Sequence, residues 1–334
     1  MSNSSNWQDF LDSHAELDKA PLISQGAMLI DLSHYGLIQV HGEDAESFLQ
    51  NQLSNDIHNV TEETFQESAW CSPKGRIKAN FRIFKQDDRY YLSVSADLIE
   101  QTIQKLSMYV MMSKVTIEDV SDSFVHFALA GDSSAALLKE ILTEDSKQVT
   151  RHKSLSILNI AGDTPRFEVF GKVDDAKALW EQCSENATIV SKNAWQFLDI
   201  KAGIPMITAA SSEAWIPQMV NYIAVGGVDF KKGCYPGQEV VARLNYLGKT
   251  KRQMYRIQID TDQLPTIGDD LVSDTSAGKI LNAAINSDGK VEALAVLKIA
   301  EAEKALKLSA NDQAEISLLD LPYSLDNSLD NSHS

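Results

Sequence analysis

The spacing of apolar side chains changes several times along the chain, and each change marks a different predicted element. Residues 76–83 alternate strictly between polar and apolar side chains, as in a strand with one buried face. Residues 99–110 instead repeat isoleucine, leucine and valine at helical spacing. The first two thirds of the chain therefore mix strands with helices.

Other segments follow the same two patterns. Strands are predicted at 29–40 (two strands joined by a turn at 33–36), 65–71, 76–84, 89–95, 115–120, 124–129, 155–160 and 166–170. Helices are predicted at 45–53, 99–110, 133–142 and 174–183, and from 191 to a stop at Gly203 and Pro205. Helices that alternate with antiparallel hairpins indicate an α+β fold rather than a doubly wound parallel sheet.

The pattern changes again near Gln253, where short strands separated by glycines predict a small antiparallel β domain. Its candidate strands are 254–259, 279–284, 292–297 and 314–318. A chain of 334 residues is too long for one small core. We predict a loosely held extension at 1–27, an α+β region at 28–245 with subdomains 28–120 and 121–245, a β domain at 246–324, and a disordered tail at 325–334.

Composition and charge exclude several classes of function. The net charge of −17 disfavours strong direct binding of nucleic acid, which depends on neutralising phosphates. No apolar run is long enough to span a bilayer, and residues 1–6 lack the pattern of a signal peptide. These features predict a cytoplasmic protein without membrane contact. The three cysteines show no metal-ligand spacing, so no metal site is predicted, and three thiols cannot hold a four-thiolate iron–sulfur cluster.

The candidate chemistry lies in the loop 231–243, which contains Cys234. Gly233 and the Pro-Gly pair at 236–237 predict a turn before a short helix whose buried side carries Val240, Val241 and Leu244. A positive helix end and the neighbouring Lys232 would favour the thiolate form of Cys234. The competing interpretations are a small buried cysteine and an ordinary exposed lysine.

The sequence Lys-Gly-Cys-Tyr-Pro-Gly-Gln-Glu at 232–239 closely resembles the signature of the YgfZ family, folate-binding proteins similar to the T-protein (aminomethyltransferase) of glycine cleavage. The resemblance extends over most of residues 30–325. Further segments that carry it are 71–76, 109–110 with 113–115, 202–205, 216–221, 226–230 and 321–324. It implies a T-protein-like fold with a C-terminal antiparallel β-barrel domain.

The resemblance also implies a folate cofactor, either tetrahydrofolate or a one-carbon derivative, in a central cavity with Cys234 at its mouth. Two aromatic positions that the family associates with folate fall on Tyr35 and Trp195. The family often has tryptophan at the first, so Tyr35 is a departure that offers less stacking area. From the residues alone, the pattern favours Trp195 as a core residue of its amphipathic helix.

Residues around the cysteine loop are further candidates for folate contact. Gln218 and Asn221 either hydrogen-bond the edge of a heterocycle or satisfy the backbone of a turn. Glu239 either complements the helix dipole, accepts a proton from Cys234 or binds a pteridine amino group. The remaining candidates in the motif are Tyr235, Gly237 and Gln238.

The family resemblance implies a role in the assembly or repair of iron–sulfur proteins, with tRNA-modifying enzymes as indirect partners. Two alternatives stay open, a folate-dependent one-carbon transferase or demethylase and a non-catalytic folate sensor or scaffold. A glycine-cleavage activity is not expected. Ala79 and Asn80 stand where T-protein-like sequences carry acidic residues, and neither side chain can act as a general base.

Overall fold

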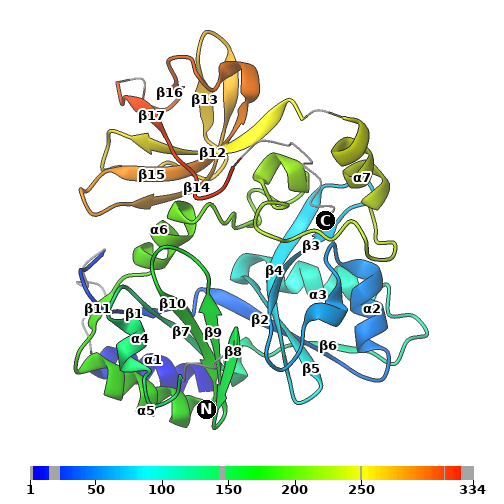
Figure 1. Cartoon of the computed structure of the whole chain (residues 1–334), viewed down its shortest axis with the longest axis vertical. Helices are drawn as coiled ribbons and strands as arrows, with labels where there is room; N and C mark the ends of the chain where they lie inside the picture. The colour runs from blue at the N-terminus through cyan, green and yellow to red at the C-terminus, as the bar shows by residue number, and fades with distance from the viewer. Residues whose placement is uncertain (1–2, 15–22, 143–146, 249, 312, 325–334) are drawn as a thin grey trace, which may run out of the picture.

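Three sheets form the framework of the chain (Figure 1). The structure is a computed structural model that describes residues 3–14, 23–142, 147–248, 250–311 and 313–324. Nearly all strand pairs are antiparallel, and helices lie beside the sheets rather than regularly between strands. The predicted α+β fold is therefore confirmed. The tail predicted at 325–334 lies outside the described residues.

The first sheet has five strands in the order β3-β4-β5-β2-β6. Its strands are β2 (Tyr35–His41), β3 (Gln66–Cys71), β4 (Ile77–Gln86), β5 (Arg89–Ser95) and β6 (Thr116–Asp119). The helices beside it are α2 (Ala45–Gln52) and α3 (Ile99–Ser107). The predicted hairpin across 72–75 is present, since β3 pairs with β4 in antiparallel register.

The second sheet has six strands in the order β11-β1-β7-β10-β9-β8. Its strands are β1 (Met28–Asp31), β7 (Val125–Ala130), β8 (Val149–His152), β9 (Leu155–Ile160), β10 (Arg166–Gly171) and β11 (Thr188–Val190). The helices α1 (Asn3–His14), α4 (Ser134–Leu137) and α5 (Val173–Ser184) lie beside it (Figure 1). Because β1 pairs with β7 and β11, residues 28–31 belong to the second sheet, whereas β2 directly after them belongs to the first.

The C-terminal sheet is a curled antiparallel sheet with the order β16-β13-β14-β15-β12-β17. Its strands are β12 (Arg252–Ile259), β13 (Asp270–Val272), β14 (Ser276–Ile285), β15 (Val291–Lys298), β16 (Lys307–Leu308) and β17 (Ile316–Leu319). The helix α6 (Asn193–Lys201) contacts β14 and β15, and its Trp195 and Leu198 pack with residues of the second sheet. This helix therefore joins two of the three sheets.

The N-terminal segment requires a correction. Residues 1–27 were expected to be loosely held, but Trp7, Phe10 and Leu11 of α1 are buried. The Trp7 ring stacks on Phe127 and meets Trp180 edge-on. Spacings of three and four residues place these side chains on one helix face, which is why a short polar helix can dock here.

The helix after the cysteine loop, α7 (Gln238–Leu247), is less buried than expected. Val241 is fully buried, whereas Val240 is exposed and Leu244 is only partly covered. In the part of the chain that the structure describes, no helix is both long and apolar enough to cross a membrane.

Candidate ligand-binding cavity

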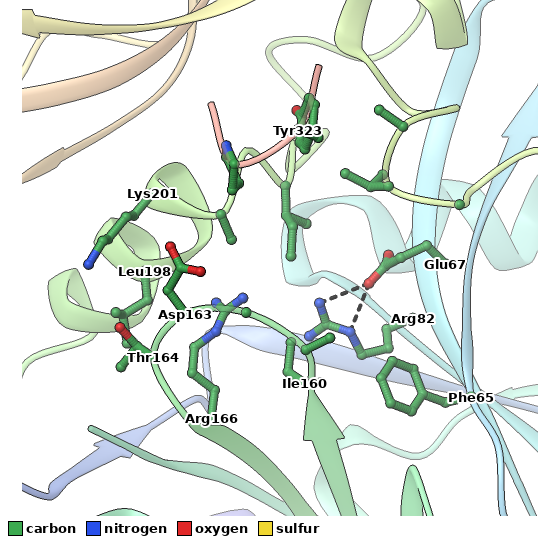
Figure 2. A pocket seen from close by; sticks show the side chains of 18 of the residues that line it. Phe65, Glu67, Arg82, Ile160, Asp163, Thr164, Arg166, Leu198, Lys201 and Tyr323 are labelled. Carbon is green, nitrogen blue, oxygen red and sulfur yellow. Dashed lines mark hydrogen bonds and ion pairs between the residues drawn. The ribbon is translucent and has the colours of Figure 1, made fainter. Parts of the chain in front are cut away.

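A large cavity lies where the first two sheets, α6 and the end of the C-terminal region meet (Figure 2). Its volume is about 500 Å³, which is in the range of small-molecule sites in proteins. It is lined by Phe65, Gln66, Glu67, Arg82, Gln148, residues 160–164, Arg166, Leu198, Lys201, Ala202, Ile204, residues 224–226, Pro322 and Tyr323. In Figure 2, Glu67, Arg82 and Phe65 lie on one side and Arg166, Asp163 and Lys201 on the other, with Tyr323 above them.

A buried ion-pair network forms one wall of the cavity. Arg82 of β4 donates to Glu67 of β3 at 2.8 Å and to Glu168 of β10 at 2.5 Å. The guanidinium therefore links the first sheet to the second. The hydroxyl of Tyr222 extends the network by donating to the Glu67 carboxylate at 3.3 Å.

The charges in this network perturb one another. Burial alone would lower the pKa of Arg82, but the Glu168 and Glu67 carboxylates raise it above its ordinary value. Burial raises the pKa of Glu67 against the opposing effect of Arg82. Burial likewise raises the pKa of Glu168 to about 7, with Arg82 again acting in the opposite direction. Each guanidinium bond favours an ionised carboxylate and burial disfavours it, so the two effects oppose each other at Glu67 and at Glu168.

A second ion pair lies beside the first. Nη1 of Arg166 donates to Oδ1 of Asp199 at 2.7 Å, and the two side chains are almost fully buried. The other terminal nitrogen of Arg166, Nη2, is buried and has no hydrogen-bond partner among the described residues. Arg166 itself lines the cavity, so a guanidinium with an unpaired nitrogen lies in the cavity wall.

The two predicted aromatic residues do not line this cavity. Trp195 is 0% exposed in the core, and the Arg166 guanidinium lies 5.2 Å from its ring centre. Tyr35 is half-buried and lines two smaller cavities. Burial raises the pKa of its hydroxyl, and the nearby Asp199 and Glu168 carboxylates add to that effect.

Lys232 is buried and bound to the backbone. It is 7% exposed, and its ammonium donates to the carbonyl oxygens of Gln50 at 2.6 Å, Leu53 at 2.5 Å and Asn55 at 3.1 Å. An ammonium has three donors, so these bonds use all of them. Lys232 therefore ties its loop to the end of α2, and the effect of its charge on the Cys234 thiol stays a prediction.

Cys234 is exposed, whereas the other two cysteines, Cys71 and Cys183, are buried. Burial raises the pKa of each buried thiol to about 12. Cys234 precedes α7 and does not line the large cavity, so the structure does not bring this thiol and the cavity together.

The rest of the motif packs on the β3–β4 hairpin. Gly237 caps α7 with a φ of 82°, and a Cβ there would lie 2.3 Å from the Ser72 carbonyl oxygen. Tyr235 is buried, and Lys232 lies 5.4 Å from its ring centre. Gln238 begins α7 and Glu239 follows it as an exposed residue in the first turn. None of these residues lines the large cavity.

Gln218 and Asn221 satisfy backbone groups. The side-chain amide of Gln218 donates to the Val241 carbonyl at 2.6 Å, and that of Asn221 donates to the Met254 carbonyl at 2.8 Å. Asn221 also adopts a left-handed conformation, which asparagine tolerates better than most residues. Among the two interpretations left open by the sequence, the structure supports the turn role.

Comparison with known proteins identifies the family. Residues 12–164 match the GCVT N-terminal domain. The chain is 30% identical to the tRNA-modifying protein YgfZ of Colwellia psychrerythraea over 308 residues, which cover 89% of this chain and 93% of that protein. The chain belongs to the YgfZ family.

The fold of this YgfZ-family chain is that of the T-protein. The crystal structure of aminomethyltransferase T of the glycine cleavage system from Bartonella henselae matches with a TM-score of 0.68 and 18% identity. The match covers 91% of this chain and 88% of that one, so it includes all three sheets. The T-protein-like fold predicted from the sequence is confirmed.

Segments that carry the YgfZ resemblance meet one another in space. Gly237 of the cysteine motif contacts the hairpin at 72–75. The Tyr323 hydroxyl donates to the Gly203 carbonyl at 2.7 Å, which joins the C-terminal segment to the end of α6 beside the cavity. The contact between Tyr323 and Gly203 shapes the cavity. The contact between Gly237 and the hairpin builds the surface that carries Cys234.

The charged residues of the cavity wall were not found from the sequence. Arg82 was assigned to the polar side of β4, and Glu67, Arg166, Glu168 and Asp199 received no role. One signal was available for Glu168 and Asp199, because each stands between apolar neighbours in a predicted strand or helix. A charged residue in such a run is seldom buried unless it is paired. Within the described residues, no group of three or more His, Cys, Asp or Glu is placed to hold a metal ion.

Proposed function

We propose that this member of the YgfZ family binds a folate in the large cavity and acts, through Cys234, in the assembly or repair of iron–sulfur proteins. Its effect on tRNA modification then follows indirectly, through tRNA-modifying enzymes that depend on such clusters. The printed name of the Colwellia relative, a tRNA-modifying protein, supports the link to tRNA.

The observation that carries folate binding is the unpaired guanidinium N–H of Arg166 in a cavity of about 500 Å³. A folate has a flat pteridine, an aromatic benzoate and an acidic tail. The cavity offers the rings of Phe65 and Tyr323 for the flat groups, and Arg166 and Lys201 for anionic ones. The Glu67 carboxylate can accept hydrogen bonds from the donor edge of a pteridine. The residues therefore fit the cofactor.

A bound folate supplies a carrier for a one-carbon unit. The residues of this chain would hold it, with the Glu67–Arg82–Glu168 network beside it. Cys234 is exposed and lies apart from the cavity lining, which supports action on a macromolecular partner at the surface.

Complementation in cells tests the role of the thiol. Cys234→Ala should lose both iron–sulfur enzyme activity and thiolated tRNA when it replaces the wild-type chain, whereas Cys183→Ala, a buried control, should retain both. Full activity of Cys234→Ala would refute a chemical role for the thiol and favour the scaffold alternative.

A one-carbon transferase or demethylase is the second candidate, and the position of Glu67 in the cavity wall favours it. The sequence offered no general base for such a reaction, but a carboxyl with a raised pKa at the cavity surface can act as one. Glu67→Gln should then lower the rate of folate-dependent transfer at saturating folate at least a hundredfold, beyond any weakening of folate binding. Unchanged transfer by this variant would exclude Glu67 as the base.

A further inference from the structure

The helix α7, which follows the cysteine loop, lies at the edge of the molecule and is largely uncovered (Figure 1). Of its 10 residues, only Val241 is buried. A helix this short is normally stabilised by packing of an apolar face. Here, however, Leu247 is 84% exposed and Val240 is 40% exposed. The described residues therefore leave apolar surface of α7 open to solvent.

The open apolar side chains of α7 share one face. Val240, Leu244 and Leu247 follow one another at spacings of four and three residues, which places them on the same side of a helix. A groove of about 340 Å³ on this side is lined by Glu239, Val240, Arg243, Leu244, Leu247 and Gly248. Because these residues belong to one helix and its end, the groove has the form of a docking surface rather than of an enclosed ligand site.

The turn between β3 and β4 packs against the first turn of α7. A Cβ built on Gly75 would lie 3.1 Å from the Cβ of Val240 and 3.3 Å from Cγ2 of Val241. The neighbours of Gly75 in this turn, Lys74 and Arg76, are both exposed. The turn therefore brings cationic residues to the end of α7 that follows Cys234.

Positive charge is concentrated in the two segments that meet here. The chain as a whole has a net charge of −17. Residues 231–256 nevertheless contain seven lysine and arginine residues and one glutamate, and residues 68–86 contain five and no acidic residue. These segments are therefore cationic within an acidic protein.

Many of these cations are exposed or half-exposed. Among the described residues of 73–78 and 231–251 they are Lys74, Arg76, Lys78, Lys231, Arg243 and Lys251. The acidic neighbours are Glu239 in the groove, Asp229, which accepts from the Lys231 backbone, and Glu213, whose backbone bonds that of Ile77. Six cations stand against three carboxylate groups, so the surface complements an acidic partner.

The apolar face distinguishes between two classes of acidic partner. A nucleic acid binds mainly through its phosphates and has no aliphatic side chains to cover valine and leucine. A protein segment that carries acidic and aliphatic residues matches both features of the surface. Amphipathic helices bind hydrophobic grooves in this way.

We propose that the groove on α7 docks an acidic amphipathic helix of a partner protein. Its aliphatic side chains contact Val240, Leu244 and Leu247, and its carboxylates pair with the cations of α7 and the turn. Cys234 lies three residues before Gly237, the residue that caps α7, so the two Cα atoms are at most about 11 Å apart. Docking therefore brings the partner to the thiol. The proposal rests on the proposed action of Cys234 on a macromolecular partner.

Fluorescence anisotropy with labelled peptides and the full chain tests the docking. The probe is a 14-residue peptide with two copies of Glu-Leu-Glu-Glu-Leu-Leu-Glu, and the matched controls replace every leucine by serine or every glutamate by lysine. Saturable binding of the probe is expected, weakening as salt is raised, with at least tenfold weaker binding of both controls. Equal binding of the serine control, or no saturable binding of the probe, would overturn the proposal.

Two other occupants of the face are distinguished in the same experiments. Tighter binding of a single-stranded RNA of equal charge would assign the surface to nucleic acid. Sedimentation that showed a dimer of the wild type and a monomer of Leu247→Ser would assign it to a second copy of this chain. Either result would overturn the proposal.

Two variants locate the peptide on α7. Leu247→Ser and Arg243→Glu should each weaken probe binding about tenfold or more. The matched controls are Leu264→Ser and Lys139→Glu, which change exposed residues outside α7 and should leave binding unchanged. Thermal unfolding checks that all four variants are folded. If the two folded α7 variants bind the probe as the wild type does, the peptide binds elsewhere and the proposal fails.

Cys234→Ala separates this proposal from the proposed function. This variant should bind the probe as the wild type does, because the groove does not include the thiol. Intact probe binding together with full activity of Cys234→Ala in cells would refute the role of the thiol alone. Loss of activity by Cys234→Ala without any probe binding by the wild type would refute the docking surface alone.

Discussion

Lys232 shows how a residue in a recognisable motif can have a structural role. Its three hydrogen bonds satisfy the carbonyl groups of Gln50, Leu53 and Asn55, which lie at and just beyond the end of α2. A positive charge at the end of a helix also complements the helix dipole. The sequence could not reveal this role, because the carbonyl groups come from a segment about 180 residues away.

Replacing Lys232 by methionine should lower the free energy of unfolding by about 3 kcal/mol, because buried carbonyl groups lose their donors. Denaturant unfolding followed by circular dichroism measures this loss. Lys231→Met is the matched control, since Lys231 is exposed and should change stability by less than about 0.5 kcal/mol. If Lys232→Met instead left stability intact and slowed alkylation of Cys234, the ammonium would serve the thiol after all.

The three cysteines should differ sharply in reactivity. In the native protein, Cys234 should react with iodoacetamide at least tenfold faster than Cys71 or Cys183, because it is exposed and they are buried with pKa values raised to about 12. Peptide mapping by mass spectrometry after timed quenching measures each rate. Similar rates for all three thiols would contradict the placement of Cys234.

At the scale of elements, local sequence patterns correctly predicted most of the longer helices and strands. The alternation at 76–83 and the helical spacing at 99–110 correspond to β4 and α3. The sequence missed short strands such as β8, β11, β13 and β16, which have two to four residues and too few positions for a pattern. It also could not show that β1 and β2 enter different sheets, since that depends on pairing with distant strands.

The docking of the cysteine loop on the β3–β4 hairpin depends on Gly237. Gly237→Ala should destabilise the protein by about 1–3 kcal/mol, because the residue has a positive φ and its Cβ would meet the Ser72 carbonyl. Thermal unfolding measures the effect. Gly233→Ala is the control from the same loop, since its Cβ would contact nothing within 4 Å. Equal melting temperatures for Gly237→Ala and the wild type would show that the loop is not held there.

At the scale of the whole molecule, the cavity is built from segments that no local pattern connects. The polar side of β4 was expected to face solvent, but Asn80 and Arg82 are buried. Asn80 is covered because its amide bonds the backbone of Pro205 and Ile207, and Arg82 is covered because it joins Glu67 to Glu168. The family resemblance predicted the fold and the class of cofactor. The residues of the cavity wall could be identified only from the assembled sheets.

Binding of 5-formyltetrahydrofolate, measured by isothermal titration calorimetry, tests the central claim most directly. Ala224 is exposed and lines the cavity, so Ala224→Trp should fill the cavity without disturbing the core. The wild type and the surface variant Ala209→Trp should bind the folate equally, and Ala224→Trp should bind at least tenfold more weakly. Equal affinity of all three proteins, or no binding by the wild type, would contradict the assignment of folate to this cavity.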